Sequence, residues 1–188
     1  MTTIAWDGVS LAGDTLVSGA DCGREYTDKV FMVSGDHNFK YFGGAGPLQD
    51  TLAVRDWLER GAKREDKPSV SDNFRGLLVD KNNNLYCLEG KLVPLPVANM
   101  YYAIGSGAGF AVGAMLYAAS IGEPITARTA IDFASVHDIH TGGRIVVLPT
   151  PLETYAGSVE PSKRVVYPLS SAAETLKPRT QSYWPHDI

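Results

Sequence analysis

Cysteine is scarce in this chain: its 188 residues include only two, Cys22 and Cys87. The two lie far apart in the sequence and form no CxxC pair. The sequence therefore predicts neither a disulfide-stapled fold nor a zinc knuckle. A reducing compartment fits this cysteine usage best.

Basic residues and long apolar runs are also lacking. There are 17 Lys and Arg against 21 Asp and Glu, a formal net charge of −4, whereas general binding to a phosphate backbone needs a basic excess. The longest apolar run, residues 110–121, is shorter than the roughly 20 residues of a membrane-spanning helix. The first seven residues carry neither a basic leader nor an apolar signal core. We expect a soluble, cytoplasmic protein without nucleic-acid or membrane partners.

Hydrophobic residues make up 44% of the chain and aromatic residues 10%, enough to build one core in a chain of this length. Hydrophobic patterning and turn residues predict strands followed by a helix, more strands, two helices and a last strand. This order is typical of an α+β fold rather than a βαβ series. The strands are expected at 4–6, 10–14, 29–33, 38–42, 76–79, 85–88, 100–104 and 144–148, and the helices at 47–61, 110–120 and 127–136.

The composition changes after Leu148. Six of the eleven prolines fall between Pro149 and Pro185, where regular secondary structure is hard to sustain. We predict a domain at 2–148 followed by a proline-rich extended arm at 149–188. The arm contains several aromatic side chains, which predicts that it lies along its own or a neighbouring subunit.

Two nucleotide or nucleophile motifs fail in the glycine-rich segment at 105–109. A GxGxxG fingerprint would need glycine where Phe110 or Val112 stands. A GxSxG elbow would need glycine where Ile104 stands. On motif grounds these glycines are best explained by close approach of a strand and a helix.

A metal site is not expected either. His137 and His140 are spaced to share a helix face, but no second pair of ligands appears elsewhere in the sequence. The sequence therefore predicts no metal and no cofactor.

The N-terminus offers a nucleophile. Removal of Met1, which a small second residue permits, would leave Thr2 with both a hydroxyl group and a free α-amine. An α-amine has a pKa of about 7.7–8.0, so part of it is unprotonated near neutral pH and can serve as a general base for the hydroxyl of the same residue.

From this terminus to Leu148 the chain resembles the proteasome β-subunit superfamily of N-terminal nucleophile hydrolases, most closely its bacterial HslV-type branch and proteasome-like bacterial and phage relatives. Several short segments match the superfamily in order. They are Thr2-Thr3-Ile4, Gly13-Asp14, Asp28-Lys29-Val30-Phe31, Gly43-Gly44-Ala45-Gly46, Ala103-Ile104-Gly105-Ser106-Gly107 and Asp138-Ile139-His140-Thr141-Gly142-Gly143.

The resemblance implies a catalytic role for each matched position. Thr2 would be the nucleophile, Lys29 would stabilise its alkoxide and depress the pKa of its amine, and Asp14 would keep Lys29 charged and oriented. A backbone N–H at Gly43, or alternatively Gly44, would stabilise the oxyanion.

Three further positions, Ser106, Asp138 and Thr141, would orient the Thr2 amine and relay protons. The resemblance also implies a four-layer αββα sandwich, a peptide or unfolded-protein substrate and a homo-oligomeric ring or stack. The resemblance leaves open whether an ATPase unfoldase docks on such an assembly. Together these implications predict a threonine endopeptidase.

Two other functions stay open at this point. An inactive scaffold subunit of the same fold would retain Met1 and use the arm for assembly. An amidohydrolase for a small amide would use the same residues on a different substrate.

Overall fold

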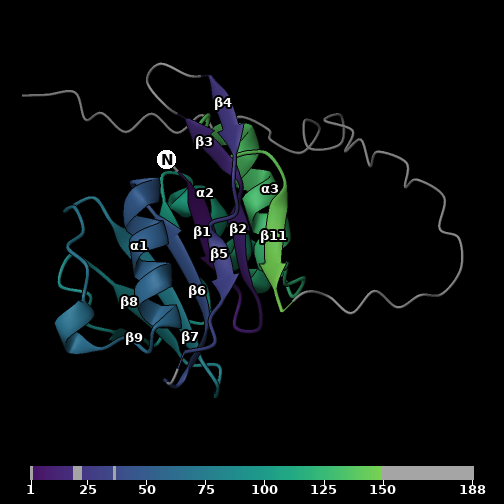
Figure 1. The fold of residues 1–188 in the computed structure, drawn as a ribbon. Helices are drawn as coiled ribbons and strands as arrows, with labels where there is room; N and C mark the ends of the chain where they lie inside the picture. The colour runs from purple at the N-terminus through teal and green to yellow at the C-terminus, as the bar shows by residue number, and fades with distance from the viewer. Residues whose placement is uncertain (1, 19–22, 36, 150–188) are drawn as a thin grey trace, which may run out of the picture. The chain divides into compact units, whose positions relative to one another are not determined.

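The computed structural model describes residues 2–18, 23–35 and 37–149, which form eleven strands, three α-helices and one 3₁₀ turn (Figure 1). The strands are β1 (Thr3–Trp6), β2 (Leu11–Asp14), β3 (Leu16–Ser18), β4 (Arg24–Tyr26), β5 (Val30–Met32), β6 (Phe39–Ala45), β7 (Arg75–Asp80), β8 (Leu85–Leu88), β9 (Leu95–Val97), β10 (Tyr102–Gly105) and β11 (Ile145–Leu148). The helices are α1 (Leu48–Glu59), α2 (Ala108–Ser120) and α3 (Ala127–His137), with the 3₁₀ turn at Arg64–Asp66.

The strands form two antiparallel sheets and a two-stranded ribbon. The first sheet has the order β10-β1-β2-β11 and the second the order β5-β6-β7-β8-β9, while β3 pairs with β4. Strand β1 is central in the first sheet, where Thr3 faces Gly105 of β10 and Ile4 faces Gly13 of β2. The start of the chain is therefore held between two neighbouring strands.

Strand β1 contributes to two different cores because its side chains alternate between the faces of the sheet. Ile4 and Trp6 join an apolar cluster with residues of the second sheet such as Leu77 and Val79. Ala5 points the other way, into a cluster with Met115 of α2 and residues of α3. All four residues of the strand are buried, so both of its faces are covered.

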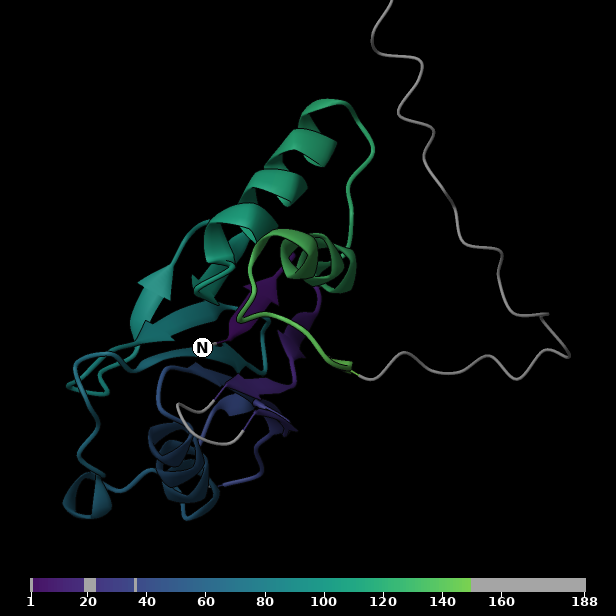
Figure 2. The ribbon, with the colours of Figure 1, turned by 90° about the horizontal axis from the view of Figure 1, so that it is seen from above.

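The helices cover opposite sides of the pair of sheets. Helices α2 and α3 pack on the first sheet mainly through small residues, including Ala111, Ala130 and Ala134. Helix α1 packs on the second sheet through larger residues, among them Trp57 against Phe42. Figure 2 shows α2 and α3 on one side of the strands and α1 on the other.

The α+β class is confirmed, and each predicted strand and helix appears with bounds shifted by a few residues. Thr126 caps α3, as the side-chain oxygen accepts a hydrogen bond from the Thr129 N–H at 3.2 Å. Three strands were not predicted. β3 and β4 are only three residues long, and β9 contains Pro96, which argues against a strand except at the sheet edge where β9 lies.

No helix in the described part of the chain is long and apolar enough to cross a lipid bilayer. The predicted arm at 149–188 lies outside the described residues apart from Pro149. The division at Leu148 therefore stays a prediction.

We expect opposite effects on stability from two glycine-to-alanine changes. Gly105→Ala should destabilise the fold by at least about 2 kcal/mol, because φ is +97° there and a Cβ would collide with the Thr2 carbonyl. Gly113→Ala in α2 should stabilise it by roughly 0.5–1 kcal/mol, because a Cβ there meets open space and alanine favours the helix. Urea denaturation measures both. A neutral Gly105→Ala would contradict the tight fit of β10 against the start of β1.

Candidate active site

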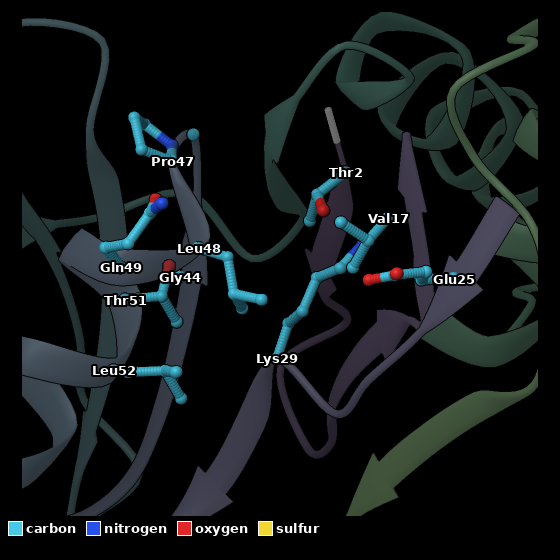
Figure 3. Close-up of a pocket in the computed structure, with 11 residues that line it drawn as sticks. Thr2, Val17, Glu25, Lys29, Gly44, Pro47, Leu48, Gln49, Thr51 and Leu52 are labelled. Atoms are coloured by element: carbon cyan, nitrogen blue, oxygen red, sulfur yellow. The ribbon is translucent and has the colours of Figure 1, made fainter. Parts of the chain in front are cut away.

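Thr2 is buried, with 2% of its surface exposed, and precedes the first residue of β1. Its carbonyl accepts a hydrogen bond from the Ser106 N–H at 2.9 Å. Thr2 lines a cavity of about 400 Å³ together with Lys29, Gly44 and residues of α1. Figure 3 shows the Lys29 side chain extending toward Val17 and Thr2, on the opposite side of this cavity from Gln49 and Leu52.

A second cavity, of about 610 Å³, also reaches Thr2. Its other lining residues come from the end of β6 and the turn before α1, from the start of β7, and from the end of β10 and the turn after it, which contains Ser106. Gly46 and Pro47 border both cavities. Thr2 therefore lines both cavities and is accessible from each of them.

Asp14 and Lys29 form a buried ion pair beside Thr2. The Lys29 Nζ lies 3.3 Å from Asp14 Oδ1, and the two side chains are 5% and 0% exposed. The Lys29 ammonium also donates to the Leu16 carbonyl. Desolvation lowers the pKa of Lys29 from its ordinary value, and the charge of Asp14 opposes that shift.

A cluster of hydroxyl groups surrounds the Asp138 carboxylate. Ser106 and Thr141 both donate to Asp138 Oδ2, at 2.6 and 2.7 Å, and the His140 N–H donates to Oδ1 at 3.2 Å. Burial by itself would raise the pKa of Asp138, but these hydrogen bonds outweigh it and lower the pKa. Asp138 is thus held as a carboxylate at neutral pH.

The structure does not bring Gly43 to Thr2. Gly43 lies within β6 between Val30 of β5 and Leu77 of β7, and a Cβ there would meet Ile4 and Val30 in the core between the sheets. The alternative, Gly44, lines the first cavity, but its N–H already donates to the Lys29 carbonyl at 3.0 Å.

Gly46 lies one residue beyond β6, at the bend before α1. It borders both cavities, and no acceptor for its backbone N–H is found among the described residues. Its φ of +110° restricts the position to glycine. The sequence analysis considered Gly43 and Gly44 and did not consider Gly46, whose position follows from the bend after β6.

Sequence reasoning also missed Thr3. It is fully buried, its N–H donates to Asp14 Oδ1 at 2.8 Å, and its Oγ lies 2.6 Å from that of Thr141. One signal was available: a hydroxyl inside a fully buried strand needs a hydrogen-bond partner.

Comparison of the sequence with models of known protein families and with curated proteins finds no match. Solved structures do match. One is Thiobacillus denitrificans BPH, 18% identical, with a TM-score of 0.53 over 78% of this chain and 95% of that one. The same protein in complex with epoxomicin matches at 19% identity and the same TM-score, with the same coverage. The two proteins share a fold.

Substitutions in a buried and an exposed ion pair should lower the free energy of unfolding by different amounts. Asp14→Asn leaves Lys29 buried without a counter-charge, and we expect a loss of about 3–5 kcal/mol in the free energy of unfolding. Asp28→Asn breaks the exposed pair with Arg144, whose side chains are 47% and 72% exposed, and should cost at most about 1 kcal/mol. Denaturant titration of both variants measures the difference, and equal losses would contradict the structural role of Asp14.

Proposed function

We propose that this protein is an N-terminal nucleophile hydrolase, a threonine endopeptidase that cleaves peptide bonds with Thr2 after removal of Met1. One observation carries the proposal. Thr2 stands where two cavities meet, beside the buried Asp14–Lys29 pair and with its carbonyl bound to the N–H of Ser106. A nucleophile, a cation and a substrate groove thus coincide at the start of the chain.

In the proposed first step, the Thr2 hydroxyl attacks the substrate carbonyl carbon and its proton passes to the α-amine of the same residue. The Lys29 ammonium stabilises the developing negative charge on Oγ, and Asp14 holds Lys29 in place. The same positive charge lowers the pKa of the α-amine, which keeps more of it in the basic form.

The tetrahedral intermediate places negative charge on the former carbonyl oxygen. The N–H of Gly46, for which the described residues provide no hydrogen-bond acceptor, is the proposed donor to this oxyanion. One such donor contributes on the order of 10²–10³ in rate. The intermediate then collapses: the C–N bond breaks, the leaving amine takes the proton, and an ester forms on Thr2. Water attacks the ester, releases the acid and restores the hydroxyl.

The solved relatives support this proposal through their fold. One of them is a complex with epoxomicin, a proteasome inhibitor. The match of folds covers 95% of the chain in that complex and 78% of the chain described here. The three core clusters, one between the sheets and one under each set of helices, support a four-layer αββα sandwich for this chain.

The Thr2 proposal predicts three results. Intact mass of the purified protein should correspond to a chain beginning at Thr2. Thr2→Ala should reduce peptide hydrolysis on the order of 10⁴-fold or more, because it removes the nucleophile, whereas Thr2→Ser should retain measurable activity. Thr129→Ala, an exposed threonine in α3, is the matched control and should leave the rate unchanged.

Retention of Met1 would overturn the proposal, because the Thr2 nitrogen would then be an amide and not a base. Unchanged hydrolysis by Thr2→Ala would overturn it equally. Comparing a casein-like unfolded protein with a small amide such as an aminoacyl anilide separates an endopeptidase from an amidohydrolase.

The proposal includes a homo-oligomer. Helix α2 contains no charged residue and exposes Phe110, Leu116 and Tyr117, with 44%, 55% and 68% of their surfaces accessible. An exposed apolar face of this kind favours association. Light scattering of the wild type should give a mass above one chain, and the Leu116→Glu, Tyr117→Glu double variant should lower it. Ser120→Glu in the same helix is the charge control, and a monomeric wild type at micromolar concentration would exclude the assembly.

A further inference from the structure

We infer that Thr3 is a positioning residue that joins the Asp14–Lys29 pair to the Ser106–Asp138–Thr141 cluster and thereby holds Thr2 in its reactive orientation. The inference rests on the proposed function. Thr3 contacts both polar groups with different atoms, its backbone N–H and its hydroxyl, so one residue ties together two sides of the site.

The first link is the peptide group between Thr2 and Thr3. Its N–H donates to Asp14 Oδ1 at 2.8 Å, and its carbonyl accepts from the Ser106 N–H at 2.9 Å. A planar peptide group bound on both edges has little freedom to rotate. The orientation of this plane sets where the Thr2 side chain and α-amine can point.

The second link is the hydrogen bond between the Thr3 and Thr141 hydroxyls. Its donor can be identified because each hydroxyl has only one proton to donate. Thr141 spends its single proton on Asp138 Oδ2, at 2.7 Å. The bond of 2.6 Å between the two threonine hydroxyls is therefore donated by Thr3. The Thr3 Oγ in turn accepts the Gly107 N–H at 3.1 Å.

These bonds form one chain from the start of α2 to the Asp138 carboxylate. It runs from the Gly107 N–H to Thr3, from Thr3 to Thr141, and from Thr141 to Asp138, where Ser106 arrives from the other side. Thr3 is fully buried, so water cannot replace its hydroxyl without rearrangement. Removing that hydroxyl leaves the Gly107 N–H without its acceptor and Thr141 without its donor.

The fit around this hydroxyl is tight. A Cβ on Gly107 would collide with the Thr3 Oγ and would lie 2.8 Å from that of Thr141. Gly109, two residues later, has open space at the same position. Gly107→Ala therefore displaces the Thr3 hydroxyl without any change to Thr3 itself. Gly109→Ala is its matched control.

Kinetics of Thr3 variants test the inference. Thr3→Val replaces the hydroxyl with a methyl group of similar size and should lower kcat by roughly 10–100-fold with KM within about twofold, because the substrate cavities stay intact. Thr3→Ser keeps the hydroxyl and should recover most of the rate. Gly107→Ala should reproduce the loss and Gly109→Ala should not. A Thr3→Val variant with wild-type kcat would overturn the positioning role while leaving the endopeptidase proposal intact.

A readout independent of catalysis separates failure of the inference from failure of the proposed function. Amide hydrogen exchange at Gly107 and Ser106 should be faster in Thr3→Val than in the wild type or Thr3→Ser. If the wild type hydrolyses no peptide but this exchange pattern holds, the linkage by Thr3 stands and the endopeptidase proposal falls. If exchange is the same in all three proteins, the linkage is wrong whatever the activity. Should Thr3→Val fail to fold, the Gly107→Ala and Gly109→Ala pair decides.

Discussion

The arrangement of the whole site depends on one buried carboxylate. Asp14 is fully buried, and burying a charge costs several kcal/mol unless it is paired and hydrogen-bonded. Four donors meet that requirement: the N–H groups of Thr3, Leu16 and Gly142 and the ammonium of Lys29. They come from β1, the first residue of β3, the segment before β11 and the residue preceding β5. Satisfying a single carboxylate therefore brings β1, the residue before β5 and the segment before β11 to the end of β2.

The same ion pair bridges the two sheets, since Asp14 belongs to the first and Lys29 leads into the second. The Asp14–Lys29 contact requires the two sheets to approach closely, and two glycines permit that approach. Gly13 and Gly43 lie on facing strands, and a Cβ on either would press on Ile4 and Val30. Gly43, to which the resemblance assigned the oxyanion, thus has a packing role, whereas Gly46 borders both cavities.

Much of the secondary structure follows from local pattern. Helix α1 begins after Pro47 and ends before Gly61 as expected, and the hairpin of β7 and β8 forms around an asparagine-rich turn. The ribbon of β3 and β4 escaped prediction because strands of three residues carry too little hydrophobic signal. In the site, Thr2 was found from its chemistry, and the acidic, lysine and hydroxyl positions were found from resemblance to a family.

The sequence by itself determined the α+β class and the order of the main elements, and it pointed to Thr2 as the candidate nucleophile. Those features depend on side-chain identity and on spacings of a few residues. Only the tertiary structure decided that Gly46 borders both cavities while Gly43 packs in the core, and that Thr3 joins the two polar groups. Such contacts connect residues more than a hundred positions apart, as between Thr3 and Thr141, and hydrogen-bond direction there depends on how each buried proton is shared. No local pattern encodes that geometry.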